Sequence, residues 1–84
     1  MPTICYFYGI MILMHLTNKE HNPPHIHAVY GDYEASFFIK DGEIYEGDFP
    51  SNGKKLVKEF VLKYSNELLK MWETGDYYKL PAIK

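Results

Sequence analysis

The chain has 84 residues, enough for one hydrophobic core and too few for two, so a single domain over residues 1–84 is expected. All nine basic residues are lysines. Without arginine the chain lacks the bidentate group that most often reads nucleic-acid bases, so nucleic acid is disfavoured as a partner. The single cysteine, Cys5, excludes an intrachain disulfide and a CxxC motif, which fits a cytoplasmic protein.

The opening stretch MPTICYFYGIMILMHL carries no charged side chain. A signal peptide would begin with basic residues and a membrane span needs about 20 apolar residues, whereas Thr3, Gly9 and His15 interrupt this shorter run. Neither is expected, and no membrane contact is predicted. Isoleucine and aromatic residues instead favour strands over residues 3–8 and 10–16, with Gly9 as a bulge or kink between them.

Residues 17–24, TNKEHNPP, are expected to form a loop, because the two prolines remove two backbone donors. Residues 25–30 and 33–39 then flank the dipeptide GD, a pattern that predicts a hairpin with a type II′ turn. A further turn leads into a short strand over residues 43–48, and Pro50 ends the sheet.

From Ser51 onward the apolar spacing changes from two to about 3.6 residues, which indicates a helix. Ser51 or Asn52 is suited to cap its start, and Gly75 to end it. The apolar face comprises Leu56, Val57, Phe60, Val61, Tyr64, Leu68 and Met71. The sequence thus predicts an α+β fold, a small antiparallel meander of about four strands with one long C-terminal helix packed on one face.

Leu62 and Leu69 do not fit this helical face. They are seven residues apart, so they lie together on the side away from the main apolar stripe, flanked by Ser65 and Trp72. Two interpretations stay open: scattered surface leucines, which are common, or an interface strip that packs on a second protein.

The heptapeptide HNPPHIH, from His21 to His27, is the most unusual part of the sequence. With a two-residue turn, His27 pairs with Ser36 and His25 with Phe38, and Glu34 lies diagonal to His27. Because strand side chains alternate, both strand histidines are predicted to project from one face, opposite Ile26 and Ala28. The motif residues singled out are His21, Asn22, Pro23, Pro24, His25 and His27.

Three interpretations of these histidines stay open. As a metal site, His25 and His27 would supply ligands at i and i+2, His21 a third, and Glu34 would complete or orient the set around a divalent transition metal. As a catalytic site, His25, His27 and Glu34 are the candidates for acid–base chemistry. As a structural feature, the imidazoles would cap loop carbonyls and lie half-buried on the sheet.

These residues carry a family resemblance. HNPPHIHAVYG, with MPTI and YFYGI near the start, EGDFP before the helix and LLKMW within it, resembles the small bacterial proteins of the domain of unknown function 4160 (DUF4160) family. The resemblance runs over nearly the whole chain. One departure is Leu13, near which relatives often carry an arginine.

The resemblance implies a small α+β fold and a cytoplasmic bacterial protein, and it carries no catalytic assignment. Genes of the family often lie beside those of another small family, in an arrangement similar to toxin–antitoxin pairs. We therefore expect a component of a two-protein, toxin–antitoxin-like module that acts through contacts with a small protein partner or with a second copy of itself. The alternative is a small histidine- or metal-dependent hydrolase, with RNA among its candidate substrates, centred on HNPPHIH.

Overall fold

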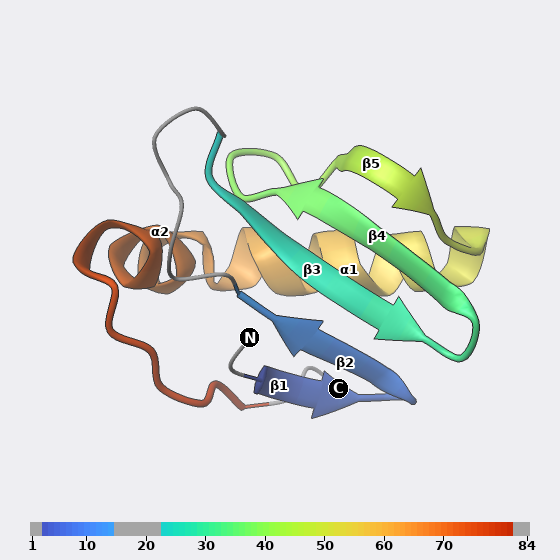
Figure 1. Ribbon diagram of the computed structural model, residues 1–84, viewed down its shortest axis with the longest axis horizontal. Coiled ribbons are helices and arrows are strands. Elements are labelled where there is room, and N and C mark those ends of the chain that lie inside the picture. The colour runs from blue at the N-terminus through green and yellow to red at the C-terminus, as the bar shows by residue number, and fades with distance from the viewer. Residues whose placement is uncertain (1–2, 15–22, 82–84) are drawn as a thin grey trace.

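The computed structural model describes residues 3–14 and 23–81, which form a two-layer α+β fold. Five antiparallel strands make one sheet in sequence order, and two helices cover one of its faces (Figure 1). The strands are β1 (Thr3–Phe7), β2 (Ile10–Leu13), β3 (His25–Tyr30), β4 (Tyr33–Phe38) and β5 (Ile44–Asp48), and the helices are α1 (Ser51–Lys63) and α2 (Ser65–Thr74). The predicted class is confirmed, whereas about four strands and a single long helix are not what the chain forms.

The additional strand arises at Gly9, where a tight turn replaces the expected bulge or kink. Phe7 pairs with Ile10, so Tyr8 and Gly9 form a two-residue hairpin loop. Both have positive φ, 49° and 79°, as a type I′ turn requires. Tyrosine rarely adopts positive φ, which is why the sequence pattern did not reveal the turn.

The β3–β4 hairpin has the predicted register. Tyr30 pairs with Tyr33 and His25 with Phe38, in unbroken alternation along the six residues of each strand. Gly31, with φ 59°, supplies the single positive-φ position that a type II′ turn needs at its first central residue.

The pairing of β4 with β5 contains a β-bulge. Ser36 pairs with Glu46 and Phe37 pairs with Ile44, so Tyr45 is the extra residue between them. In an unbroken register Tyr45 would oppose Phe37 and point toward the helices. The bulge instead lets Tyr45 and Glu46 project from the same side of the sheet.

The helical region is interrupted at Tyr64, whose φ and ψ are −114° and 24°. Its N–H still donates to the Phe60 carbonyl and its carbonyl accepts from Leu68, so the apolar stripe continues in register across the break. Tyr64, Ser65 and Asn66 are consecutive residues of modest helix propensity, which favours the interruption here.

The two predicted helix ends differ in outcome. Gly75 ends α2 with φ 78°, as expected. The predicted cap by Ser51 or Asn52 is wrong, because Pro50 occupies the N-cap position and no side chain caps the helix. The first helical bond runs from Lys54 N–H to the Pro50 carbonyl at 2.9 Å.

The core lies between the sheet and the helices. Phe60 is fully buried and stacks on Phe7 with ring centroids 5.3 Å apart. Phe49 packs over Gly53 of α1, where a Cβ would come within 2.6 Å of the ring. The buried residues of the helices are Gly53, Val57, Phe60, Val61, Leu68, Met71 and Trp72. The predicted apolar stripe therefore faces the core, with Leu56 and Tyr64 at its half-buried margin.

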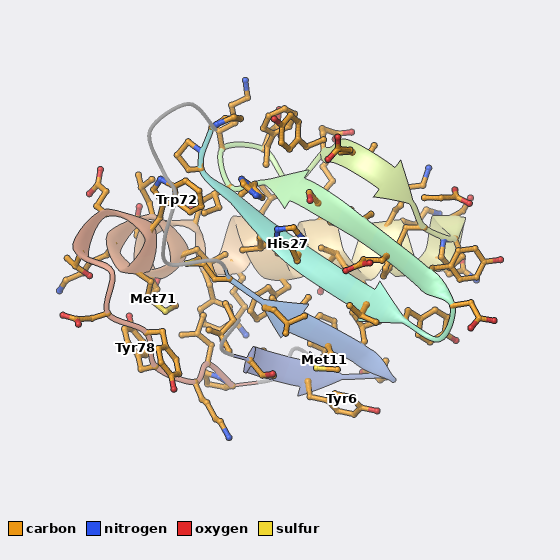
Figure 2. All side chains as sticks on the ribbon, in the orientation of Figure 1. Tyr6, Met11, His27, Met71, Trp72 and Tyr78 are labelled. Carbon is orange, nitrogen blue, oxygen red and sulfur yellow. The ribbon has the colours of Figure 1, made fainter. Side chains whose placement is uncertain are left out.

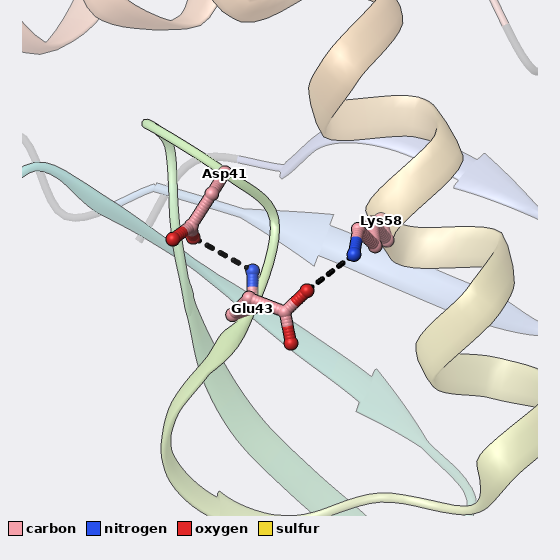
Figure 3. A network of polar contacts seen from close by, with 3 residues as sticks. All are labelled: Asp41, Glu43 and Lys58. Atoms are coloured by element: carbon pink, nitrogen blue, oxygen red, sulfur yellow. Dashed lines mark hydrogen bonds and ion pairs between the residues drawn. The ribbon is translucent and has the colours of Figure 1, made fainter.

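A polar network ties the β4–β5 turn to α1 (Figure 3). The Asp41 carboxylate accepts from the Glu43 N–H at 3.0 Å, and Glu43 forms an ion pair with Lys58. The turn approaches the helix closely, since a Cβ at Gly42 would lie 2.9 Å from Lys58 Cγ. The Glu43 carboxylate raises the pKa of Lys58.

The segment after α2 runs back to β1. Leu80 is buried, and its N–H donates to the Ile4 carbonyl at 2.8 Å along the outer edge of that strand. On the way, the Tyr78 N–H contacts Met71 Sδ at 3.4 Å (Figure 2). Neither helix among the described residues has both the length and the apolar character needed to cross a membrane.

Candidate functional site

One face of the sheet is covered by α1 and α2, and the other, which we call the bare face, is covered by no described helix (Figure 1). Register and alternation assign its side chains. Figure 2 shows three of them, Tyr6, Met11 and His27. The bare face comprises Thr3, Tyr6, Met11, Leu13, His25, His27, Val29, Glu34, Ser36, Phe38, Tyr45, Glu46 and Asp48.

His25 lies at the end of the bare face beside α2. Its ring packs against the rings of His27, Trp72 and Tyr45, with centroids 5.1, 5.2 and 5.5 Å away. Only 8% of the residue is exposed. Its Nδ1 lies 2.8 Å from the Pro23 carbonyl, and because a carbonyl only accepts, Nδ1 carries the hydrogen. His25 is thus fixed in one orientation and one ring-nitrogen role.

The two prolines of the motif use their carbonyls to hold this end of the sheet together. Pro23 accepts from the His25 ring, and Pro24 accepts from the Ile39 N–H at 3.1 Å, just beyond β4. Neither proline has a backbone donor of its own. Pro23, Pro24 and His25 therefore have a structural role here, since they anchor the chain that enters β3 to both the His25 ring and the end of the neighbouring strand.

His27 lies one row further along β3 and is half-buried. Its Nδ1 is 3.3 Å from Ser36 Oγ. Both residues line a shallow pocket of about 300 Å³ together with Glu34, Ala35, Glu46 and Gly47. The structure therefore brings His25, His27, Ser36 and Glu34 onto one face. An imidazole beside a hydroxyl and two carboxylates can exchange protons with a bound molecule.

Tyr45 and Trp72 complete the surroundings of His25, and sequence reasoning missed both. The β-bulge turns Tyr45 toward the bare face, where its ring also lies 4.9 Å from that of Phe38. Gly47, inside a strand, was the available signal for a bulge. Trp72, predicted to flank Leu69 on the helix, is only 6% exposed, and its ring packs on that of His25.

A second, more apolar groove of about 250 Å³ lies where the motif meets α2. Leu69, 39% exposed, lines this groove, whereas Leu62, 53% exposed, does not. The two leucines are therefore not equivalent. The groove is lined by Pro23, Pro24, Phe38, Ile39, Lys40, Ser65, Asn66 and Leu69.

A metal site of the predicted kind needs at least three ligand side chains close together. Over residues 3–14 and 23–81, no group of three His, Cys, Asp or Glu side chains is arranged to hold a metal ion. His21, the predicted third ligand, and Asn22 lie outside the described residues.

Cys5 does not belong to the site. It is buried on the helix-covered side of the sheet, and burial raises the pKa of its thiol. A protonated, enclosed thiol is a poor nucleophile and a poor metal ligand.

Comparison with known proteins places the chain in a family. The family model for the domain of unknown function DUF4160 matches residues 9–73, which include the whole motif, the bare-face strands from β2 onward and both helices up to Glu73. No curated protein and no solved structure matches the chain. The protein belongs to the DUF4160 family.

Proposed function

We propose that the protein is the binding component of a two-protein, toxin–antitoxin-like module, and that its partner covers the bare face of the sheet. The observation that carries the proposal is the composition of that face. An antiparallel sheet with one face in water usually alternates apolar and polar residues, with the polar ones outward. Here β2 and β3 instead direct Met11, Leu13 and Val29 away from the core.

These three side chains form a continuous apolar area. Met11 pairs with Val29 across β2 and β3, and Leu13 pairs with His27 in the next row. All four residues are half-buried, so part of each side chain stays accessible to a partner. Contiguous exposed apolar area on a small domain is typical of a surface that another protein covers.

The neighbouring gene product is the partner to test, because the family resemblance leads us to expect a paired gene. The two proteins should co-purify when produced together. Val29→Lys and Met11→Lys should each weaken the complex at least about tenfold, since each places a charge in the interface. Leu62→Lys, the same kind of change on the helix side, is the matched control.

Growth of cells that produce each protein alone, and then both together, tests the biological half of the proposal. Arrest by one protein that the other relieves supports the module. Absence of a complex, or a complex equally weakened by Leu62→Lys and Val29→Lys, would argue against binding through the bare face. Circular dichroism of each variant checks that the fold is retained.

One contact favours a second candidate function, a histidine-dependent hydrolase. His27 Nδ1 lies 3.3 Å from Ser36 Oγ in an open pocket, within reach for proton transfer. Glu34 and Glu46 in the same pocket would repel the phosphates of RNA, so a neutral ester is the better substrate class. Hydrolysis of a neutral chromogenic ester that disappears in both His27→Ala and Ser36→Ala would support this candidate, and a rate equal to that of buffer would reject it.

A further inference from the structure

If the bare face binds a partner as proposed above, its charges restrict the chemistry of that partner. The five described strands contain the acidic residues Glu34, Glu46 and Asp48 and no lysine, and the only residues in them that can carry a positive charge are the histidines His25 and His27. All three carboxylates project from the bare face, because Glu34 pairs with Asp48 in one row and Glu46 pairs with Ser36 in the next. All three residues are exposed.

The pairing of Glu34 with Asp48 is unfavourable by itself. Like charges directly opposite each other on adjacent antiparallel strands repel and destabilise the sheet. No lysine of the strands is available to separate them. A cationic group from outside the sheet, placed between the two carboxylates, would relieve this repulsion and gain two charge-assisted hydrogen bonds.

The same row has an apolar end. It runs from Tyr6 and Met11 through Val29 to Glu34 and Asp48, one residue from each strand. With neighbouring strands about 4.8 Å apart, five strands span about 19 Å. This row is thus divided into an apolar part on β1 to β3 and an acidic part on β4 and β5.

We propose that the bare face binds a partner segment that carries apolar side chains at one end and lysine or arginine at the other. The apolar end lies over Met11 and Val29, and the basic end lies between Glu34 and Asp48. Nucleic acid and anionic membranes do not fit this face, because their phosphates meet carboxylates there. Because one end of the row is apolar and the other end is acidic, the partner segment can lie along it in only one direction.

Two synthetic peptides test the chemistry directly. Both are long enough to span the row and carry leucines in one half, and the other half carries lysines in one peptide and glutamates in its counterpart. Fluorescence anisotropy with the intact protein should show binding of the lysine peptide alone. The affinity should fall as salt is added, because these carboxylates are exposed and are screened.

Matched charge reversals locate the binding. Glu34→Lys should weaken the lysine peptide about tenfold or more, whereas Glu59→Lys, an equally simple reversal of an exposed glutamate on α1, should change its affinity less than about twofold. Equal affinity for both peptides, or an equal loss in Glu34→Lys and Glu59→Lys, overturns the inference. Binding insensitive to salt overturns it as well.

The two proposals can fail separately. If the neighbouring gene product binds through Val29 but tolerates Glu34→Lys and high salt, the interaction function stands and the basic chemistry fails. If the lysine peptide binds and that protein does not, the chemistry stands and the assigned partner fails. Sedimentation velocity of the protein alone tests whether a second copy of the chain occupies the bare face. Self-association that Glu34→Lys abolishes would mean that the lysine-bearing helices of a second copy fill the face, and would overturn the inference of a separate partner.

Discussion

The ring of His25 has a packing role that does not depend on any ligand. It contacts three other rings and donates to the Pro23 carbonyl, and it is almost fully enclosed. Removing it leaves a cavity and an unpaired carbonyl. His27 is only half-buried, so its removal should destabilise the fold less.

We expect His25→Ala to lower the free energy of unfolding by about 2 to 4 kcal/mol, in the presence of chelator as well as without it. Urea unfolding in EDTA and in Zn²⁺ checks this. If His25 and His27 bind metal, added Zn²⁺ raises the melting temperature of the parent and not that of the double alanine variant. A His25→Ala variant that loses stability only when metal is present would show that the metal interpretation is right and the packing interpretation wrong.

Gly47 makes a different kind of residue-scale contribution, through its backbone. It has φ 100°, and a Cβ there would lie 2.5 Å from the Glu34 carbonyl oxygen. We expect Gly47→Ala to destabilise the protein by about 2 to 4 kcal/mol, from strain and from the displaced β5. Gly31→Ala is the control, because φ is also positive (59°) but the Cβ would meet open space. Equal urea midpoints for the two variants would contradict this reading of β5.

At the scale of elements, the helices are attached to the sheet mainly by apolar burial. Phe60→Ala is expected to lower stability by about 3 to 5 kcal/mol, because the ring is fully buried and stacks on Phe7. Lys58→Ala should change the free energy of unfolding very little by comparison, since the ion pair of Lys58 with Glu43 is exposed. Because the pKa of Lys58 is raised in the folded state, the small contribution of the pair is present at neutral pH and disappears as pH rises through that pKa. Equal losses in a urea melt would mean that the ion pair attaches α1 as strongly as the core does, against this expectation.

The two exposed leucines of the helices allow a second prediction at this scale. We expect Leu69→Lys to weaken association with a partner more than Leu62→Lys does, because only Leu69 lines the groove beside Pro23 and Pro24. A pull-down with the neighbouring gene product, and a sizing column for self-association, compare the two. Equal losses of association in the two variants would support the continuous Leu62 and Leu69 strip that the sequence suggested. Retention of every association in both variants would leave them as ordinary surface residues.

At the scale of the whole molecule, the segment after α2 returns to β1. It buries Leu80 and covers part of an edge that would otherwise offer unpaired backbone groups to another chain. We expect Leu80→Ala to lower stability by about 2 to 4 kcal/mol and to promote aggregation, whereas Tyr77→Ala, at a residue that is 52% exposed, stays within about 0.5 kcal/mol of the parent. Thermal unfolding followed by light scattering measures both effects. An aggregation onset unchanged in Leu80→Ala would show that the segment does not protect the edge.

How far the sequence alone predicts this molecule depends on how local each signal is. The β3–β4 register followed from one glycine-containing turn and strict alternation, and the projection of His25 and His27 from one side of β3 followed from the register. The bulge at Tyr45 and the burial of Trp72 could not be predicted, because each depends on contacts between elements distant in sequence. The break at Tyr64 was hidden because the apolar stripe continues through it. The charge pattern of the bare face needed the register of all five strands.

The sequence order of the strands bears on how quickly the molecule forms. The strands pair in sequence order, and three of the four connections are short: the two-residue turns at Gly9 and Gly31 and the loop that contains Gly42. Contacts close in sequence require little loop-closure entropy, and chains rich in them cross their folding barrier faster. We expect folding to begin at the β3–β4 hairpin, which has the longest unbroken pairing among the described strands. The contact between Leu80 and Ile4 joins residues near the two ends of the described chain, so we expect it to form late and to open early, and brief local unfolding to expose the β1 edge.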